Sequence, residues 1–445
     1  MQPDFRNKRV TVVGMARSGI AAARALHALG ASVTITDKKP LDQLAGQIQQ
    51  LGAQGIKVEA GGHPERLFIE TDLIVLSPGV PKIPPILAAK RHGVKVIGEL
   101  ELGWLLADAP FAGITGTNGK STVTTLVGLM LQKAGKKTLV AGNIGNALTE
   151  SLSGLRGQDW IVVELSSFQL EDIDTFRPRV ATILNVTQDH LDRYPTMEDY
   201  AEAKARVFLN QGKDDVLVLN CDDPLVRALA SRAASRIVPF SRLEELANGA
   251  CVKLGDLVVA GKVICPISDI RIKGVHNLEN ALAAAAVATA AGADAASIAS
   301  VLREFPGLEH RLEFVRTKDG VTYINDSKGT NVGAVVKSVE GFDAPVILIA
   351  GGLDKGSDFR PLFDLFKRKV KLLILIGKAA DAMEKALGAS TETVRAATLA
   401  EAVRIGHDRA GSGDVVLLSP ACASFDMFRD FEDRGRQFKD AVRAL

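Results

Sequence analysis

Aromatic residues make up only 5% of this chain of 445 residues, and its charges nearly cancel. So few aromatic side chains argue against a platform on which successive nucleobases stack. The 54 basic and 52 acidic side chains leave a formal net charge of +2, which is too small for a strong overall positive field. Both shortages argue against a nucleic-acid-binding protein, and we expect no nucleic-acid partner.

Cysteine and long apolar runs are also scarce. The four cysteines show no C-x-x-C spacing, so the sequence predicts neither a zinc knuckle nor a redox pair, and scattered single thiols suit a reducing compartment. The first residues mix charged and apolar side chains, unlike a signal peptide. The most apolar stretch, Ala281 to Gly292, is 12 residues long, which is too short to cross a bilayer. We therefore expect a cytoplasmic protein without a membrane partner.

The chain does have enough apolar material for several cores. Hydrophobic residues make up 47% of it, and at about 150 residues per domain its length favours three domains. Apolar, β-branched runs alternate with helical patterns, which is typical of parallel sheets covered by helices on both faces. Between Gly249 and Gly274, short runs broken by glycine predict β-hairpins. The sequence predicts an α/β fold of three domains: Rossmann-like (1–98), P-loop ATPase-like (99–307) and again Rossmann-like (308–445).

The segment GTNGKST, Gly116 to Thr122, follows an apolar strand pattern and opens a helical one. Glycines in such a turn let backbone N–H groups approach phosphate oxygens, and the helix N-terminus adds partial positive charge. Lys120 would reach the β- and γ-phosphates, and Ser121 or Thr122 would hold Mg²⁺. Ile114 stands where the strict Walker A pattern has glycine. The plainer alternative is an ordinary strand–turn–helix with a surface lysine.

The segment GMARSG, Gly14 to Gly19, matches the dinucleotide fingerprint G-x-G-x-x-G except at Ala16. Asp37 ends the next strand pattern, where an acidic residue can bind a ribose hydroxyl. Three interpretations stay open for this turn: a dinucleotide site, a site for another nucleotide such as a UDP moiety, or a tight turn that needs small residues for packing.

Three further polar residues lie near the ends of strand patterns in the central region. Glu164 ends an apolar strand, where an acidic group can hold Mg²⁺ directly or through water, although such a residue can also be merely solvated. His190 is either a metal ligand or a structural histidine. Lys204 lies inside a helical pattern, and its position alone predicts a surface lysine.

Three polar loops follow strand patterns in the last third of the chain. They are NDSKGTN (Asn325 to Asn331), GGLDKGSDF (Gly351 to Phe359) and LSPACASFDMF (Leu418 to Phe428). The carboxyl edge of a parallel sheet is where α/β folds bind ligands. Packing alone does not require three such loops, so we expect a second ligand site there.

Taken together, these motifs resemble the Mur ligase family, the ATP-dependent amide-forming enzymes of peptidoglycan precursor synthesis. The resemblance covers essentially the whole chain, and the family's phosphate loop, T-G-T-N-G-K-[ST], accounts for the departure from Walker A. Besides the loops above, the motifs that carry it are GNIG (Gly142 to Gly145), ELSSFQLE, NVTQDHLDRY, HNLENALAA and the pair His310–Arg311. NDSKGTN together with LSPACAS favours addition of D-glutamate over addition of L-alanine or a diamino acid.

The resemblance implies a three-step amide synthesis with ATP and two Mg²⁺ ions. The carboxylate of UDP-N-acetylmuramoyl-L-alanine would attack the γ-phosphate of ATP, and the amine of D-glutamate would attack the resulting acyl phosphate. Phosphate would then leave from a tetrahedral intermediate. Such an enzyme mainly has to position the reactants and neutralise charge. We expect it to act as a monomer.

The resemblance also implies roles for single residues. Lys120 and Ser121 would contact phosphate and Mg²⁺, Glu164 and His190 would be metal ligands, and Lys204 would be carbamylated and direct its new carboxylate at the metal. Further contacts with ATP would come from Gly116, Thr117, Asn118, Gly119, Thr122, Asn280, Arg311 and Asp326. The amino acid and the transferring phosphate would be surrounded by Lys328, Thr330, Lys355, Ser424, Phe425 and Phe431. The UDP-linked substrate would be bound by Arg17, Ser18, Asp37, Lys38, Gly79, Asn143 and Ser166.

Three competing hypotheses remain. Folylpolyglutamate synthases share the phosphate loop and the last domain, but they lack a complete nucleotide-binding α/β domain ahead of the loop, where this chain has roughly 100 residues. A dinucleotide-dependent oxidoreductase would rest on GMARSG alone and leave the other loops unexplained. A non-enzymatic nucleotide-binding regulator would not need the set of Glu164, His190 and Lys204.

Overall fold

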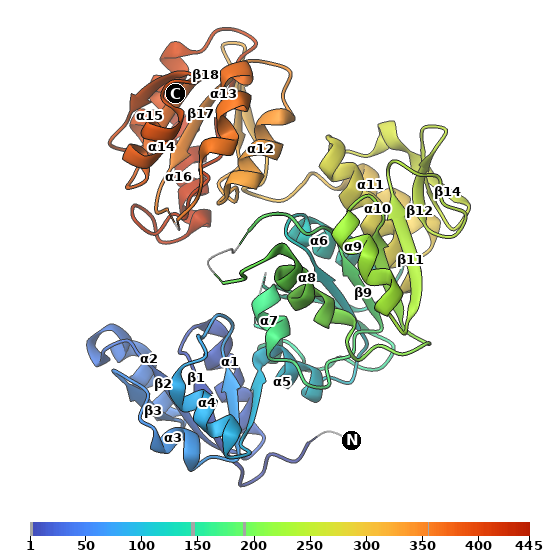
Figure 1. Ribbon diagram of the computed structural model, residues 1–445, viewed down its shortest axis with the longest axis vertical. Helices are drawn as coiled ribbons and strands as arrows, with labels where there is room; N and C mark the ends of the chain where they lie inside the picture. Colours follow the sequence, from blue (N-terminus) through green and yellow to red (C-terminus); the bar gives the residue numbers. More distant parts are fainter. Residues whose placement is uncertain (1–2, 144–146, 190–192, 355) are drawn as a thin grey trace. The chain divides into compact units, whose positions relative to one another are not determined.

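A computed structural model describes residues 3–143, 147–189, 193–354 and 356–445 of the chain. These residues form two compact units. Unit 1 consists of Met1–Val186, Thr196–Ile270 and Glu279–Glu304, and unit 2 of Thr187–Pro195, Arg271–Leu278 and Phe305–Leu445. Unit 1 contains two sheets and unit 2 contains a third (Figure 1). The predicted α/β fold built on three sheets is confirmed, whereas the exact points of division remain a prediction.

The first sheet has five parallel strands in the order β3-β2-β1-β4-β5. They are β1 (Arg9–Val13), β2 (Ser32–Asp37), β3 (Lys57–Ala60), β4 (Leu73–Leu76) and β5 (Lys95–Gly98). The accompanying helices are α1 (Arg17–Ala28), α2 (Leu41–Ala53), α3 (Arg66–Ile69), α4 (Pro84–Arg91) and α5 (Glu99–Leu106). Successive strand residues point to opposite faces. Val12 therefore packs in the core that α1 and α2 cover, and Val13 in the core that α3 and α4 cover.

The second sheet carries the phosphate-loop motif. Its nine strands have the order β14-β13-β12-β11-β10-β9-β6-β8-β7. They are β6 (Phe111–Thr115), β7 (Thr138–Gly142), β8 (Trp160–Glu164), β9 (Val180–Ile183), β10 (Val216–Asn220), β11 (Arg236–Ser241), β12 (Ala250–Lys253), β13 (Asp256–Val259) and β14 (Lys262–Pro266). The helices are α6 (Lys120–Lys133), α7 (Ser167–Glu171), α8 (Met197–Ala205), α9 (Pro224–Ala228), α10 (Val275–Ala290) and α11 (Ala295–Glu304).

Pairing in this sheet changes character along its length. From β7 to β12 the strands are parallel, and β12, β13 and β14 then form an antiparallel meander at the edge. The hairpins predicted between Gly249 and Gly274 are thus confirmed. Strand β6 is buried along its whole length and lies between β8 and β9. The loop after β6 is consequently flanked by the loops that follow β8 and β9.

The third sheet, in unit 2, has the order β15-β16-β20-β17-β18-β19. Its strands are β15 (Glu313–Lys318), β16 (Val321–Asn325), β17 (Val346–Gly351), β18 (Val370–Ile376), β19 (Glu392–Arg395) and β20 (Val415–Leu418). Its helices are α12 (Val332–Glu340), α13 (Phe363–Lys369), α14 (Ala380–Leu387), α15 (Leu399–Arg409) and α16 (Phe431–Ala444). Helices α12 to α14 pack on one face and α15 and α16 on the other, so the central strands are apolar throughout.

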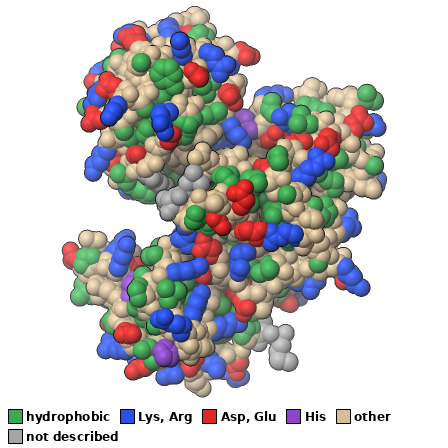
Figure 2. Space-filling model, viewed as in Figure 1, with side chains coloured by type: hydrophobic (Ala, Val, Ile, Leu, Met, Phe, Trp, Pro, Cys, Tyr) green, Lys and Arg blue, Asp and Glu red, His purple; other side chains and the backbone are tan. Residues whose placement is uncertain are grey.

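The distribution of charge on the surface and the length and polarity of the helices agree with what the amino-acid composition predicts. On the face shown in Figure 2, basic and acidic side chains are interspersed, as the small net charge leads one to expect. In the described part of the chain, every helix is too short or too polar to cross a membrane.

Candidate active site

The phosphate loop lies between β6 and α6, as the sequence predicts. Its two glycines have backbone angles that favour glycine, with φ of 151° at Gly116 and 87° at Gly119. A Cβ on Gly119 would collide with the side-chain oxygen of Asn280, which extends from α10. Ser121 and Thr122 lie buried in the first turn of α6. The structure therefore brings Asn280 to the loop, together with the two hydroxyl residues that the sequence assigned to Mg²⁺.

Two lysines converge on this loop. The ammonium of Lys120 donates to the carbonyl oxygens of Gly116 (2.9 Å) and Thr117 (2.8 Å). Lys204, on α8, donates to the same Gly116 oxygen at 3.0 Å, and its Nζ lies 4.0 Å from the centre of the Tyr200 ring. Its side chain is 1% exposed, so the prediction of a surface lysine from position alone is wrong. Lys204 instead belongs to the base of the phosphate loop.

Asn185 stabilises the phosphate loop through hydrogen bonds, and the sequence predicted no role for it. Its backbone oxygen accepts from the N–H of Thr117 (2.9 Å), and its side-chain oxygen accepts from the N–H of Asn118 (2.8 Å). Its side-chain amide donates back to the carbonyl of Asn118 at 3.1 Å. The loop thus keeps its shape through contacts within the chain. The signal was present in the NVTQDHLDRY motif, which begins at this asparagine.

Glu164 lies beside the phosphate loop, where a carboxylate could bind a metal ion. It pairs with Ile114 of β6, next to the phosphate loop, and is 2% exposed. Its Oε1 accepts a hydrogen bond from Asn143 (2.9 Å), whereas within the described residues its buried Oε2 has no hydrogen-bond partner. A buried carboxylate oxygen without a donor is costly unless a cation binds it. The residues present therefore fit Mg²⁺. His190 lies outside the described residues.

Ser166 has a local structural role beside Glu164. It is the N-cap of α7, where its hydroxyl accepts from the N–H of Gln169 (3.3 Å) and the Gln169 side chain accepts from the N–H of Ser166 (3.0 Å). This reciprocal pair is a capping box. Its implied contact with substrate remains a prediction.

The turn after β1 in the first sheet is held by Asp37. The Asp37 carboxylate accepts from the N–H of Met15 (2.7 Å) and from the N–H of Lys39 (3.0 Å). A Cβ on Gly19 would collide with the carbonyl oxygen of Gly14, which explains the need for glycine in this turn. The remaining residues that the sequence assigned here are at least partly exposed: Arg17, Ser18, Lys38 and Gly79.

The three polar loops of unit 2 meet at one edge of the third sheet. Strands β16, β20 and β17 are neighbours and parallel, so their carboxyl ends lie side by side. The backbone N–H of Ala421 donates to Gly329 (2.9 Å), and Leu353 and Ala423 exchange two backbone hydrogen bonds. The predicted second ligand site therefore has its loops joined into one surface.

Asp326 is the most constrained residue of these loops. It is 3% exposed, and its Oδ2 accepts from the hydroxyls of Ser338 and Ser419, both at 2.7 Å. Its Oδ1 accepts from the N–H of Leu312 at 3.3 Å. Burial raises the pKa of this carboxyl, and the two serine hydrogen bonds oppose that rise. Through these contacts within the chain, Asp326 joins two loops. Its implied contact with ATP remains a prediction.

The other residues assigned to this edge differ in exposure. Lys328 has its ammonium 5.4 Å from the centre of the Phe431 ring, an arrangement that favours a cation. Ser424 is buried, whereas Phe425 is 68% exposed, which is unusual for a phenylalanine. Thr330 is partly buried. Lys355 lies outside the described residues.

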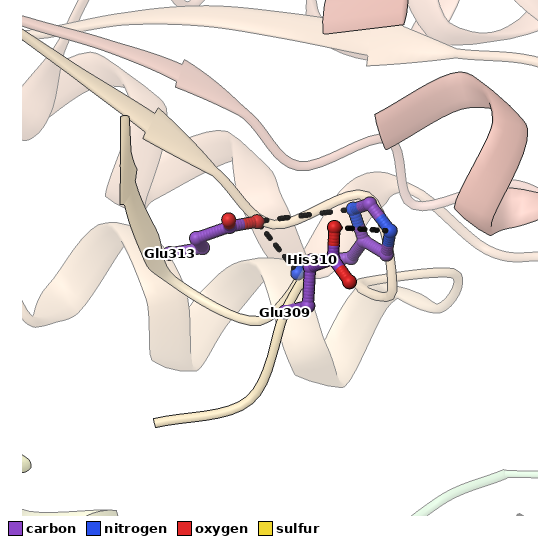
Figure 3. Close-up of side chains that lie close together, drawn as sticks. All are labelled: Glu309, His310 and Glu313. Carbon is purple, nitrogen blue, oxygen red and sulfur yellow. Dashed lines mark hydrogen bonds and ion pairs between the residues drawn. The ribbon is translucent and has the colours of Figure 1, made fainter. Parts of the chain in front are cut away.

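Arg311 lies within the segment whose Glu309, His310 and Glu313 form a cluster of acidic and imidazole groups (Figure 3). The His310 ring lies 3.6 Å from a Glu309 oxygen and 3.8 Å from a Glu313 oxygen, and burial lowers its pKa. Lys439 of α16 pairs with Glu309 (2.5 Å) and Glu313 (3.0 Å). Because one lysine bridges both carboxylates, the cluster is best explained as an ion-pair network that attaches the Arg311 segment to α16.

The second sheet and the loop after β6 have the strand–loop–helix arrangement of P-loop proteins, and two further α/β sheets accompany them. Three family models match the chain: "Mur ligase MurD-like, N-terminal domain" at residues 8–98, "Mur ligase middle domain" at 114–288 and "Mur ligase, glutamate ligase domain" at 310–422. The chain belongs to the Mur ligase family.

Individual relatives agree with this assignment. A protein of Geotalea daltonii named UDP-N-acetylmuramoylalanine--D-glutamate ligase is 49% identical over 446 residues, which cover 99% of this chain and 98% of the relative. A protein of Pelotomaculum thermopropionicum with the same name is 47% identical over 453 residues, covering 100% and 99%. The solved structure of UDP-N-acetylmuramate-alanine ligase MurC from Thermotoga maritima is 20% identical, with a TM-score of 0.60 over 98% of this chain and 100% of that chain. At that identity it supports the fold alone.

Proposed function

We propose that this protein is an ATP-dependent ligase that joins D-glutamate to UDP-N-acetylmuramoyl-L-alanine, with release of ADP and phosphate, in peptidoglycan precursor synthesis. The observation that carries the proposal is near-half identity, over 99% of the chain, to relatives named for this reaction. The phosphate loop with its two lysines supplies the chemistry that such a ligase needs.

The reaction needs an activated carboxyl group, because a carboxylate is a poor electrophile. A carboxylate oxygen of the UDP-linked substrate attacks the γ-phosphorus of ATP, and the bond to ADP breaks. The amine of D-glutamate then attacks the acyl carbon, the carbon–phosphate bond breaks and phosphate leaves. Lys120 lies at the loop that would hold the phosphates, so its charge can neutralise the oxygens of the transferring group.

The ligands of the metal site would come from several segments around the phosphate loop. Ser121, Glu164, His190 and a carbamylated Lys204 would together hold two Mg²⁺ ions, which neutralise phosphate charge when bound. Among the described residues, the buried Oε2 of Glu164 has no hydrogen-bond partner, and this supports a bound cation at that atom. Asn143 keeps the carboxylate oriented by binding its other oxygen.

The two substrates would use different sheets. The turn of the first sheet would bind the uridine nucleotide, Asn143 would lie near the muramoyl end, and Ser166 would also contact this substrate. The joined loops of the third sheet would bind D-glutamate through Lys328, Thr330, Lys355, Ser424, Phe425 and Phe431. We propose domain limits of 1–98, 99–307 and 308–445, and a cytoplasmic monomer without a nucleic-acid partner.

The competing hypotheses are not favoured. A dinucleotide-dependent oxidoreductase would rest on GMARSG alone and would leave the phosphate loop and the loops of the third sheet unexplained, and the full-length relatives are named as ligases. For a folylpolyglutamate synthase, the complete first sheet would be superfluous, and the full-length relatives carry another name.

A substrate panel tests the proposal. Phosphate release is expected to require ATP, UDP-N-acetylmuramoyl-L-alanine and D-glutamate together, because only the amine of the amino acid completes the turnover. The panel replaces D-glutamate by L-glutamate, L-alanine or a diamino acid, with malachite-green detection of phosphate. Equal turnover with L-alanine or a diamino acid would contradict the assignment. Binding of NAD(P)H without any phosphate release would favour the oxidoreductase instead.

A charge-removing change at Glu164 tests the metal site. Glu164→Gln keeps the size of the side chain and an oxygen for Asn143, but it loses the negative charge. We expect the Mg²⁺ concentration for half-maximal phosphate release to rise about tenfold or more. Glu150→Gln, at an exposed glutamate of the same unit, is the matched control. An unchanged Mg²⁺ dependence in folded Glu164→Gln would show that this carboxylate does not serve the metal.

A further inference from the structure

Arg434 is a fully buried arginine in unit 2. It lies in the first turns of α16, whose N-cap is Asp430, and at 0% exposed it is among the largest fully buried side chains of the described residues. Arginine is almost never fully buried unless it is paired with an opposite charge. Its burial therefore needs an explanation, and the sequence motifs assigned it no role.

The guanidinium of Arg434 spans the loops at the ligand edge of the third sheet. Its Nε donates to the Ser327 hydroxyl (2.9 Å), and one terminal nitrogen donates to the Ser327 carbonyl (2.8 Å). The other terminal nitrogen donates to the Cys422 carbonyl (3.2 Å). A Cβ placed on Gly352 would come within 3.3 Å of that nitrogen. One side chain thus binds the first and third polar loops and lies close to the second.

The charge of Arg434 is not balanced by these contacts. All of its hydrogen-bond acceptors are neutral oxygens, and within the described residues it forms no ion pair with a carboxylate. Burial lowers its pKa to about 10, so it still carries its proton at neutral pH. The negative charges of Asp426 and Asp326 lie near enough to oppose this lowering of the pKa. What the geometry shows is a charged donor that holds two loops through neutral acceptors.

Two of the loops that Arg434 holds carry residues assigned to the amino acid. Lys328 follows Ser327 directly, and Ser424 lies two residues after Cys422. The hydroxyl of Ser327 also donates to the carbonyl of Phe431 at 2.8 Å, which links the loop to the first residue of α16. A shift of the guanidinium would therefore move Lys328, Ser424 and Phe431 together.

We propose that Arg434 is a positioning residue for the amino-acid site: its charged hydrogen bonds fix the loops that carry Lys328 and Ser424 in the arrangement that binds the amino acid. This inference rests on the proposed function, since it takes D-glutamate as the amino acid. Arg434 acts through the loops and touches no reacting atom.

Kinetics of two substitutions test the role. Arg434→Lys keeps the charge but loses the planar fork, and Arg434→Gln loses the charge. We expect the KM for D-glutamate to rise about tenfold in Arg434→Lys and further in Arg434→Gln, because charged hydrogen bonds hold the loops. The KM for ATP should stay unchanged. Arg443→Gln, at an exposed arginine near the end of the same helix, is the control and should match the wild type. Equal changes in every KM, or no change, would overturn the proposal.

Hydrogen exchange of the ligand-free protein gives a readout that does not depend on turnover. In Arg434→Lys, amides of residues 327–331 and 421–425 should exchange faster, while those of the first sheet stay unchanged. If the wild type does not use D-glutamate, the proposed function fails, yet the exchange result still decides whether Arg434 holds the loops. If neither Arg434 variant folds, the KM of Ser327→Ala for D-glutamate tests the proposal instead. Loss of this hydroxyl, which accepts from Arg434 and donates to Phe431, should raise the KM for D-glutamate about threefold, and an unchanged KM would overturn the proposal.

Discussion

Replacing Lys120 by alanine is expected to lower kcat for phosphate release by about 100-fold or more, since a charge aimed at the transferring phosphoryl group is lost. In the structure the Lys120 ammonium donates to two carbonyl oxygens of the phosphate loop, Gly116 and Thr117. Phosphate oxygens, which carry full charges, would be stronger acceptors than these carbonyls. The measurement is the steady-state rate at saturating substrates, with folding checked by circular dichroism and thermal melting.

Two companion variants separate charge from structure. Lys133→Ala removes a half-exposed lysine from the same helix, α6, where it pairs with Glu304 at 3.6 Å, and should leave kcat unchanged. Lys120→Arg keeps the positive charge on a bulkier group and should fall between the alanine variant and the wild type. A folded Lys120→Ala protein with near-normal kcat would show that this lysine only shapes the loop.

The sequence was most informative where backbone conformation decides the outcome. GTNGKST requires a glycine turn between a buried strand and a helix, and the structure has that turn with positive φ at Gly116 and Gly119. Alternation of apolar strands with helices likewise predicted the parallel sheets, because only strands covered on both faces are apolar throughout. Glu164 was placed correctly because a strand end next to the phosphate loop follows from the order of strands.

Side chains whose role depends on tertiary packing were missed. Asn185 holds the phosphate loop through three hydrogen bonds, although the sequence shows only an asparagine at the end of a strand. Arg434 lies within a strongly polar helical segment, where an arginine normally faces solvent. Its burial follows from loops more than 80 residues away in sequence, Ser327 and Gly352, which no local pattern reveals.

Lys204 is the clearest case in which position alone misled. Its helix, α8, is rich in alanine and charged residues, and such a composition suits a surface helix. The structure buries Tyr200 and Lys204, one turn apart on one face, so that Lys204 reaches the phosphate loop. Its ammonium and that of Lys120 share the carbonyl of Gly116, and two like charges so close repel each other.

Lys204→Ala is expected to lower kcat by about 100-fold or more while leaving the protein folded, because Lys204 is expected to act as a carbamate beside the metal. An unprotonated lysine amine and CO₂ form the carbamate with release of one proton. The carbamate keeps an N–H that can still donate to Gly116, and it replaces a positive charge beside Lys120 by a negative one that Mg²⁺ can bind. The measurement is kcat with and without bicarbonate in carefully degassed buffer.

Chemical rescue distinguishes an anionic from a cationic role for Lys204. The Gly116 carbonyl and the Tyr200 ring, which Lys204 contacts in the structure, also suit an unmodified ammonium. If the carbamate is the working form, acetate should partly restore the activity of Lys204→Ala and ammonium chloride should not. Neither acetate nor bicarbonate should restore the activity of Lys120→Ala. ¹³C-bicarbonate should give the wild type a carbamate signal in the NMR spectrum that Lys204→Ala lacks. Rescue by ammonium alone, without that signal, would mean that Lys204 works as a buried cation at the base of the phosphate loop.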